Sequence, residues 1–408
     1  MQRFPFSWRA GAALIGGLGL MAGGLGSAVA CLFLILLAPE SSAPLASVTS
    51  VASLAVLGLG LGLPLFWHGL RAWQGHRDTP FAPPRAAVLA LIYVAAVGIG
   101  QGVLSFQLSP RLLFPPFHVL AGALPPLIVL AFVGRRLGQA ARRREVIGQM
   151  ASGVVIGGAG AIVLVGLAAV GVALALGVLL ALTPDGLQSM QSLLEQLQQP
   201  GWGQTPDDLL SLLFTPLGMV GLLLVVVIVG PLVEEMLKPV GVLFIRRRPD
   251  KATAFLWGVA GAAAFAAAEG MLNGSVSLEA WLIVIVMRIG TALIHCLGGG
   301  LVGLGWYALR TAHRPWRALG LYLAAATLHG TWNLVTLGIS GTALGLETLG
   351  ETVVGLGMLS LIGVLALLFL ASVAGLGWLV HWLAADVRAA SAASDPNTKT
   401  RPQILGTG

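Results

Sequence analysis

Residues 225–250 read "VVVIVGPLVEEMLKPVGVLFIRRRPD" and place three charged side chains inside an apolar run. Glu234, Glu235 and Lys238 have valine, leucine, glycine and proline around them, and an arginine cluster follows at residues 246–248. An ionisable group within a hydrocarbon-spanning segment is unfavourable unless it is paired or serves a function. These three residues are therefore the first candidates for a functional site.

The composition of the chain indicates a membrane protein. Of its 408 residues, 57% are hydrophobic and 10% are charged, and the mean hydropathy is +0.90. Soluble domains lie outside this range. The two cysteines, Cys31 and Cys296, exclude a disulfide framework and a cysteine-rich metal site. The net charge of +7 comes mainly from short loops between apolar runs, so membrane lipids are the expected partners and nucleic acid is not.

Ten apolar runs are long enough to cross a bilayer, which takes about 20 residues. They lie at 11–37, 49–70, 86–106, 116–133, 150–182, 213–245, 252–272, 279–309, 316–338 and 352–384. The sequence therefore predicts an all-α polytopic bundle of about ten spans.

The basic residues predict how the bundle is oriented. With a cytoplasmic N-terminus, all of the 23 Lys and Arg fall inside except Arg111, which lies outside, and Lys238 and Arg288, which lie within spans. Positively charged loops stay on the cytoplasmic side. We expect a multi-pass protein of the plasma membrane with both termini in the cytoplasm.

Mid-span charges are confined to the sixth to ninth spans, which divides the chain into regions. We expect a four-span scaffold (1–148), a fifth span with an acidic extracytoplasmic loop (149–212), a functional core (213–340), a last span (341–386) and a disordered cytoplasmic tail (387–408).

The polar residues of the core recur at similar depths. At 1.5 Å per helical residue from the nearest cytoplasmic Arg or Lys, Glu234 and His329 lie roughly 18 Å deep, His295 roughly 22 Å and Glu269 roughly 27 Å. We expect them to meet in one site. Its candidate residues are Glu234, Glu235, Lys238, Glu269, His295, His329 and Asn333.

Helical spacing suggests a different role for each of these residues. Glu234 and Lys238 are four residues apart, so the lysine can offset that carboxylate and leave Glu235 free. His329 and Asn333 also share a face, which would turn the amide toward a substrate carbonyl or a water. Glycines would let the eighth span approach a neighbour closely; they are Gly298, Gly299, Gly300, Gly303 and Gly305.

Two histidines and several carboxylates suit peptide hydrolysis, which needs an activated water, a general acid and an oxyanion-stabilising group. They also make a plausible Zn²⁺ site, with His295, His329 and either Glu269 or one of the glutamate pair as ligands. The two rings would then bring ligand nitrogens within roughly 3–4 Å of each other. Proton-coupled transporters use the same residue types, so a transporter remains an alternative.

The order of motifs resembles the PrsW family of intramembrane proteases, a distant relative of the CAAX prenyl endopeptidases and the bacteriocin-immunity proteins. The similarity covers about residues 210–340 and rests on EExxK at Glu234, FxxxE from Phe265 to Glu269, His295 after an upstream Arg288, and HxxxN from His329. The CAAX branch has a histidine where this chain has Glu269.

The resemblance implies that the glutamate pair activates water and that the histidines bind metal or shape an oxyanion site. It implies a membrane-associated protein substrate, which for this family is an anti-sigma factor. A non-catalytic scaffold of the same superfamily would keep the fold and lose the chemistry.

Overall fold

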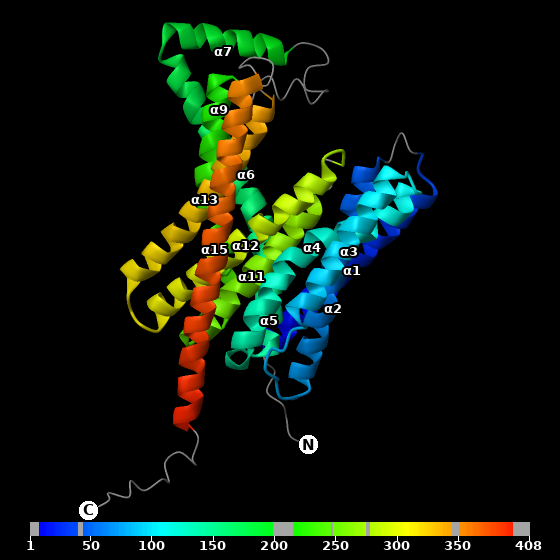
Figure 1. The fold of residues 1–408 in the computed structure, drawn as a ribbon, viewed down its shortest axis with the longest axis vertical. Helices are drawn as coiled ribbons and strands as arrows, with labels where there is room; N and C mark the ends of the chain where they lie inside the picture. Colours follow the sequence, from blue (N-terminus) through cyan, green and yellow to red (C-terminus); the bar gives the residue numbers. More distant parts are fainter. Residues whose placement is uncertain are drawn as a thin grey trace, which may run out of the picture.

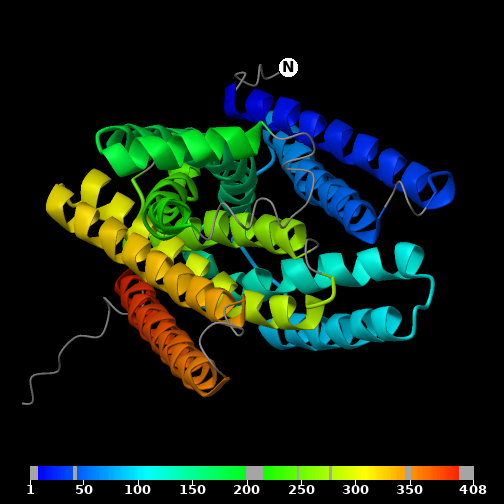
Figure 2. The same cartoon turned by 90° about the horizontal axis from the view of Figure 1, so that it is seen from above.

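Helix α11 (Lys251–Asn273) runs through the middle of the molecule, and it is the most buried of the candidate membrane spans (Figure 2). The computed structural model describes residues 8–39, 44–198, 215–245, 248–274, 278–344 and 351–394. Within these ranges every regular element is a helix, and no residue lies in a β-strand. The predicted all-α bundle is confirmed.

The first six spans follow the expected order. They are α1 (Trp8–Leu36), α2 (Leu45–Trp73), α3 (Ala86–Ser105), α4 (Pro110–Leu137), the continuous α5 (Arg143–Ser152), η2 (Gly153–Gly158) and α6 (Ala159–Ala181), and the sixth rod, built from α9 (Pro216–Leu223), η3 (Leu224–Val229) and α10 (Gly230–Leu237). Between the fifth and sixth spans, α7 (Pro184–Leu197) lies across one end of the bundle (Figure 1).

The last spans are α11, α12 (Trp281–Arg310), α13 (Pro315–Leu344) and α15 (Glu351–Ser394), so α15 extends past the expected end of the last span at residue 386. Nine helical segments of the described ranges are long and apolar enough to cross a membrane. Helix α13 has the length, at 30 residues, but is not among the nine. Its polar residues, which include His329 and Asn333, lower its hydropathy.

Small residues bring α11 and α12 into close contact. A Cβ atom added at Gly258 of α11 would overlap the carbonyl of Gly299, and one added at Gly303 would overlap the carbonyl of Ala254. Without side chains at the crossing, the two backbones approach closely. The expectation that glycines of the eighth span permit a close approach is confirmed for Gly299 and Gly303.

A buried histidine ties the N-terminal spans to this core. Nε2 of His118 on α4 lies 2.7 Å from the carbonyl oxygen of Met271 on α11, so this nitrogen carries the proton and donates it. Nδ1 of the same ring accepts from Nε1 of Trp281 on α12 at 2.8 Å. Because both ring nitrogens are satisfied by buried partners, His118 serves to join α4 to the core.

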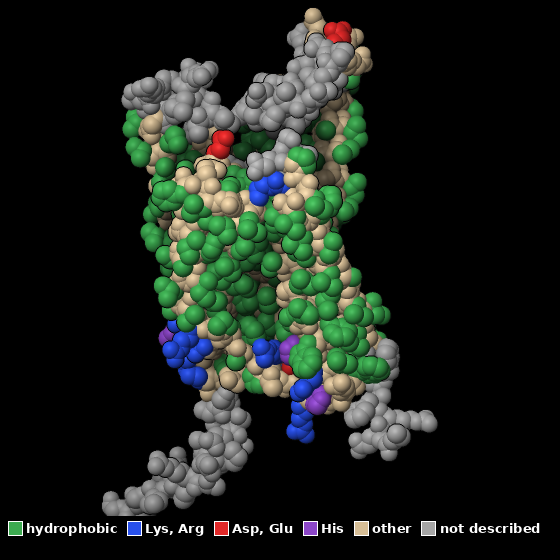
Figure 3. All heavy atoms as spheres, turned by 90° about the vertical axis from the view of Figure 1, so that its right-hand side faces the viewer, with side chains coloured by type: hydrophobic (Ala, Val, Ile, Leu, Met, Phe, Trp, Pro, Cys, Tyr) green, Lys and Arg blue, Asp and Glu red, His purple; other side chains and the backbone are tan. Residues whose placement is uncertain are grey.

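The surface of the molecule has the distribution that a membrane protein needs. Figure 3 shows a broad apolar band, and most of the described Lys and Arg side chains visible on this face gather at its lower end. Helix α7 lies at the opposite end of the molecule (Figure 1). The chain is therefore an integral multi-pass membrane protein, as its nine apolar helices indicate.

Candidate active site

The sixth rod changes its helical winding just before the glutamate pair. Residues Leu224–Val229 form a π-helical stretch, in which the N–H of Gly230 bonds to the carbonyl of Val225 five residues earlier. The next donor in that pattern would be residue 231, which is a proline and has no N–H. The carbonyl of Val226 is left without its helical donor.

Helix α13 fills that gap. Nδ2 of Asn333 donates to the carbonyl oxygen of Val226 at 3.0 Å. Gly330 lies against the carbonyl of Val227 so closely that a Cβ atom there would overlap it. The hydroxyl of Tyr322 donates to the carbonyl of Leu232 at 2.7 Å. Three residues of α13 thus fix the position of the rod that carries Glu234 and Glu235.

Asn333 therefore faces backbone, whereas the sequence predicted contact with a substrate carbonyl or a water. The sequence did not predict that Asn333 bonds to the carbonyl of Val226, because this bond depends on how α13 packs against the sixth span. Tyr322 was not among the predicted site residues. Its signal in the sequence is weak, since a tyrosine near a span end is common.

The centre of the site is a buried pair of Glu235 and Lys238. Nζ of Lys238 lies 2.6 Å from Oε1 of Glu235, and neither side chain is exposed. Oε2 of Glu234 is farther away, at 3.6 Å. Lys238 thus pairs with Glu234 as the spacing predicts, but it does not leave Glu235 free: α10 ends at Leu237 before Pro239, and Lys238 lies closer to the residue three positions back.

Two imidazoles complete this centre. Nδ1 of His295 lies 2.5 Å from Nζ of Lys238, and Nδ1 of His329 lies 3.0 Å from Oε1 of Glu235. The rings meet edge to face, with centroids 4.6 Å apart, and both are buried. His295 and His329 thus lie side by side across α12 and α13, whereas the expected separation of roughly 3–4 Å between their ligand nitrogens stays a prediction.

Glu269 contacts the ring nitrogen of His295 that faces away from Lys238. Its Oε2 lies 2.8 Å from Nε2 of His295, and its Oε1 accepts from Arg288 at 2.9 Å and from Asn273 at 3.3 Å. Because Nδ1 of His295 faces an ammonium, the ring proton lies on Nε2 and is donated to Glu269. Arg288 and Glu269 thus orient His295 from behind.

Glu234 is more accessible than the neighbouring Glu235. Its side chain is 23% exposed, whereas that of Glu235 is fully buried. Oε2 of Glu234 lies 3.9 Å from Nε2 of His329. The site is therefore partly open at Glu234 and at Glu269, whose side chain is 27% exposed, while Glu235 is enclosed.

Glycine at position 298 makes room for the enclosed carboxylate. A Cβ atom at Gly298 of α12 would lie 2.7 Å from Oε2 of Glu235. This oxygen is buried and has no hydrogen-bond partner in the described part of the chain. A buried carboxylate oxygen without a partner is unusual, and a catalytic role is one of the explanations for such an atom.

The cluster has the residues to hold a metal ion. Glu234, His295 and His329 each offer a ligand atom, and these atoms lie within 4.8 Å of one another. Both histidines also carry a carboxylate on another nitrogen, Glu269 for His295 and Glu235 for His329, as metal-bound histidines commonly do. The donor set therefore suits a metal, with Glu234 as the carboxylate ligand and Glu269 behind a histidine, but Nδ1 of His295, the nitrogen left for the ion, faces the Lys238 ammonium.

The Lys238 ammonium lies next to the position that a metal ion would occupy. It already lies against Nδ1 of His295 and Oε1 of Glu235, where it supplies a positive charge to the same groups. The ring of Phe265 lies beside it, with Nζ 4.7 Å from the ring centroid. A bound divalent ion would place a second cation next to this one.

Six of the seven predicted site residues thus meet in one place, and Asn333 instead bonds to the backbone of Val226. Residues from α10, α11, α12 and α13 form a continuous set of contacts deep in the bundle. The fold and the site define a polytopic membrane protein with a buried glutamate, histidine and lysine centre.

The chain belongs to the PrsW family of intramembrane metalloproteases, whose family description matches residues 158–373. This match extends beyond the core expected at 213–340 to include all of α6 and part of α15. No curated protein matches the chain, and no solved structure matches it. Family membership makes the protein an intramembrane protease.

Proposed function

We propose that the protein hydrolyses a peptide bond in a membrane-associated protein, with Glu235 as the group that accepts a proton from the attacking water. The observation that carries this proposal is the convergence of Glu235, Lys238, His295 and His329 in one buried cluster. Burying several ionisable groups together is costly, and a structural role alone would be met as well by apolar residues. Because the chain belongs to a protease family, we assign peptide-bond hydrolysis to this cluster.

Glu235 is suited to that role by its surroundings. The Lys238 ammonium favours the ionised carboxylate, and the bond to His329 fixes its orientation. The second oxygen of Glu235 has no hydrogen-bond partner among the described residues and is the atom we assign to proton uptake. The same carboxyl group would return the proton to the departing amine.

We propose Zn²⁺ as the metal, held by Glu234, His295 and His329. Bound there, it would supply a Lewis acid for the scissile carbonyl and a water of lowered pKa. Glu269 and Arg288 position His295 for this task, and Glu235 positions His329. The partly exposed Glu234 marks the side from which water and substrate arrive.

A metal-free mechanism is the second candidate, and the position of Lys238 favours it. The ammonium lies among Glu235, His295 and Glu234 and already provides a cation there. In that mechanism Glu235 activates the water directly, and the Lys238 ammonium stabilises the oxyanion. The chemistry would then be that of a glutamate-type protease.

For the substrate we propose a polypeptide anchored in the same membrane. The family resemblance suggests an anti-sigma factor, and the site residues come from four neighbouring helices, α10 to α13. We propose the plasma membrane as the protein's location, on the family resemblance alone.

The test is turnover by purified protein in vesicles that contain a library of single-span peptides, each with a quenched fluorophore pair. Glu235→Gln keeps the shape of the side chain but cannot take the proton, so we expect loss of turnover. Glu279→Gln alters an exposed glutamate outside the cluster and should leave turnover unchanged. Full activity of Glu235→Gln would refute its role as the base.

A further inference from the structure

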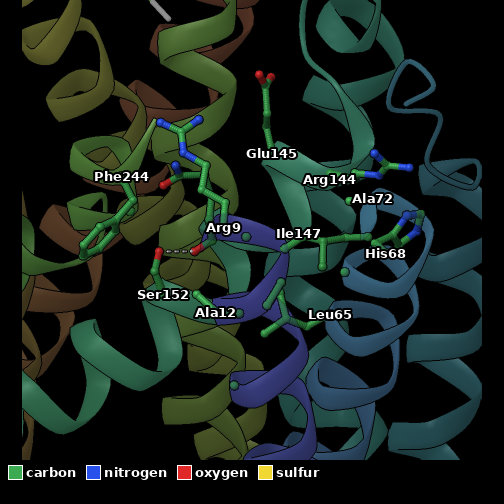
Figure 4. A pocket seen from close by; sticks show the side chains of 18 of the residues that line it. Arg9, Ala12, Leu65, His68, Ala72, Arg144, Glu145, Ile147, Ser152 and Phe244 are labelled. Atoms are coloured by element: carbon green, nitrogen blue, oxygen red, sulfur yellow. Dashed lines mark hydrogen bonds between the residues drawn. The ribbon is translucent and has the colours of Figure 1, made fainter. Parts of the chain in front are cut away.

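A large cavity lies apart from the active site, between the α1–α2 hairpin and α5. Its volume is about 1030 Å³, at the upper end of the range of small-molecule sites. Figure 4 shows Arg9 of α1, Leu65 and His68 of α2, and Glu145 and Ile147 of α5 around this space. None of the residues at the active centre lines it.

One end of the cavity is basic. Four arginines and two acidic residues line it, which leaves two positive charges in excess; they are Arg9, Arg77, Arg142, Arg144, Asp78 and Glu145. The two carboxylates are already engaged within the protein. Asp78 accepts from the backbone N–H of Arg144 and lies 3.9 Å from its side chain. Glu145 accepts from the backbone N–H of Arg142 at 3.1 Å.

One nitrogen of the Arg9 guanidinium lacks a hydrogen-bond acceptor among the described residues. This atom, Nη2, is buried. A buried guanidinium nitrogen without an acceptor is costly, and an oxyanion that lies between Arg9 and Arg142 would satisfy it.

The other end of the cavity is apolar. Its wall there is formed by Leu20 of α1, Leu65 of α2, and Ile147, Val155 and Ile156 along α5 and η2. A free phosphate or a small polar anion would fill only the basic end and leave this wall uncovered. A ligand with an anionic head and a long hydrocarbon tail matches both ends.

We propose that this cavity binds an anionic phospholipid, with its phosphate at Arg9 and Arg142 and one acyl chain along Leu65, Ile147 and Ile156. Basic pockets between membrane helices are known to favour anionic headgroups. The lipid would fill the gap between the α1–α2 hairpin and the wall of α5 and so hold the hairpin in place. A zwitterionic lipid brings a cation to a site that already has an excess of arginine, and would bind less well.

The wall that the lipid contacts is continuous with the active centre. Gln149 and Ser152 line the cavity, and Gly153 follows so close to α11 that a Cβ there would overlap the carbonyl of Gly261. Gly261 in turn lies against the carbonyl of Lys238. Occupancy of the cavity is therefore expected to stabilise the packing around the catalytic rod.

The test compares two lipids on the purified full chain. After delipidation in detergent, dioleoyl phosphatidylglycerol should raise the unfolding temperature and remain bound in native mass spectrometry, whereas dioleoyl phosphatidylcholine should do neither. Arg9→Gln combined with Arg142→Gln should weaken phosphatidylglycerol binding about thirtyfold. Arg136→Gln combined with Arg314→Gln removes the same charge outside the cavity and should have little effect.

A second variant fills the apolar end of the cavity and leaves the charge of the cavity unchanged. Gly148 lines the cavity and a Cβ added there meets nothing within 4 Å, so Gly148→Leu should fit and displace the lipid tail. Gly98→Leu makes the same change on the exposed face of α3, also into open space, and is the control.

Equal stabilisation by both lipids would overturn the proposal, as would unchanged phosphatidylglycerol binding in the arginine pair variant or in Gly148→Leu. If a variant unfolds before lipid is added, the other variant decides the result. None of these readouts depends on protease activity.

Discussion

The ammonium of Lys238 lies 2.5 Å from Nδ1 of His295, at a point where both side chains are buried. The contact sets the protonation of the ring, because a nitrogen that faces an ammonium must accept. His295 then donates from Nε2 to Glu269. A lysine on one helix thus determines which face of a histidine on another is available.

Removal of this lysine should destabilise the protein strongly. Lys238→Met leaves Glu235 buried without its counter-charge, which costs about 3–5 kcal/mol for a buried pair. The measurement is reversible unfolding in detergent. Lys251→Met breaks the exposed pair of Lys251 with Asp386 and should cost about 0–1 kcal/mol. Equal losses in the two variants would contradict the central place of Lys238.

Metal affinity should depend on the carboxylate behind His295. Glu269→Gln leaves the three proposed ligands in place but replaces the partner that orients one of them, so we expect Zn²⁺ to bind about 10–100-fold more weakly. Competition with a chromophoric chelator measures the dissociation constant. His295→Ala combined with His329→Ala should abolish binding, and Glu279→Gln should not alter it. Wild-type protein that turns over substrate in excess chelator, with no zinc bound, would favour the metal-free mechanism.

Asn333 should be important only because residue 231 is proline. Asn333→Ala leaves the carbonyl of Val226 without its donor, at a cost of about 1–3 kcal/mol. Pro231→Ala restores a backbone N–H, so the double variant should lose less stability than Asn333→Ala alone. A double-mutant cycle measures this coupling. Thr331→Ala, which removes a hydroxyl bonded only within α13, is the control. Additive losses would show that the two residues are independent.

Gly298→Ala should impair catalysis more than folding. The new methyl group would lie 2.7 Å from Oε2 of Glu235 and displace that carboxylate. A shift of about 1 Å in a reacting group can lower turnover about 100-fold. Gly320→Ala adds a methyl group to α13 in open space and serves as the control. Normal turnover by Gly298→Ala would show that Glu235 does not act from its observed position.

Much of the site was predictable from the sequence because membrane helices have few reasons to contain charge. The spacing of Glu234, Glu269, His295 and His329 from basic loops placed them at similar depths, and the structure brings them together. The length of apolar runs likewise gave the spans, since bilayer thickness fixes how many residues a helix needs.

Tertiary structure decided which of these residues touch. Lys238 pairs with Glu235 because α10 ends before Pro239, a detail that regular helical spacing does not contain. Glu269 contacts His295 from behind, and Asn333 bonds to backbone, because contacts between helices depend on their rotation and register. Hydropathy fixes neither of these. The cavity beside Arg9 arises in the same way, from the angle at which the α1–α2 hairpin meets α5. The sequence by itself determined which groups enter the membrane and at what depth, whereas packing between helices determined their partners.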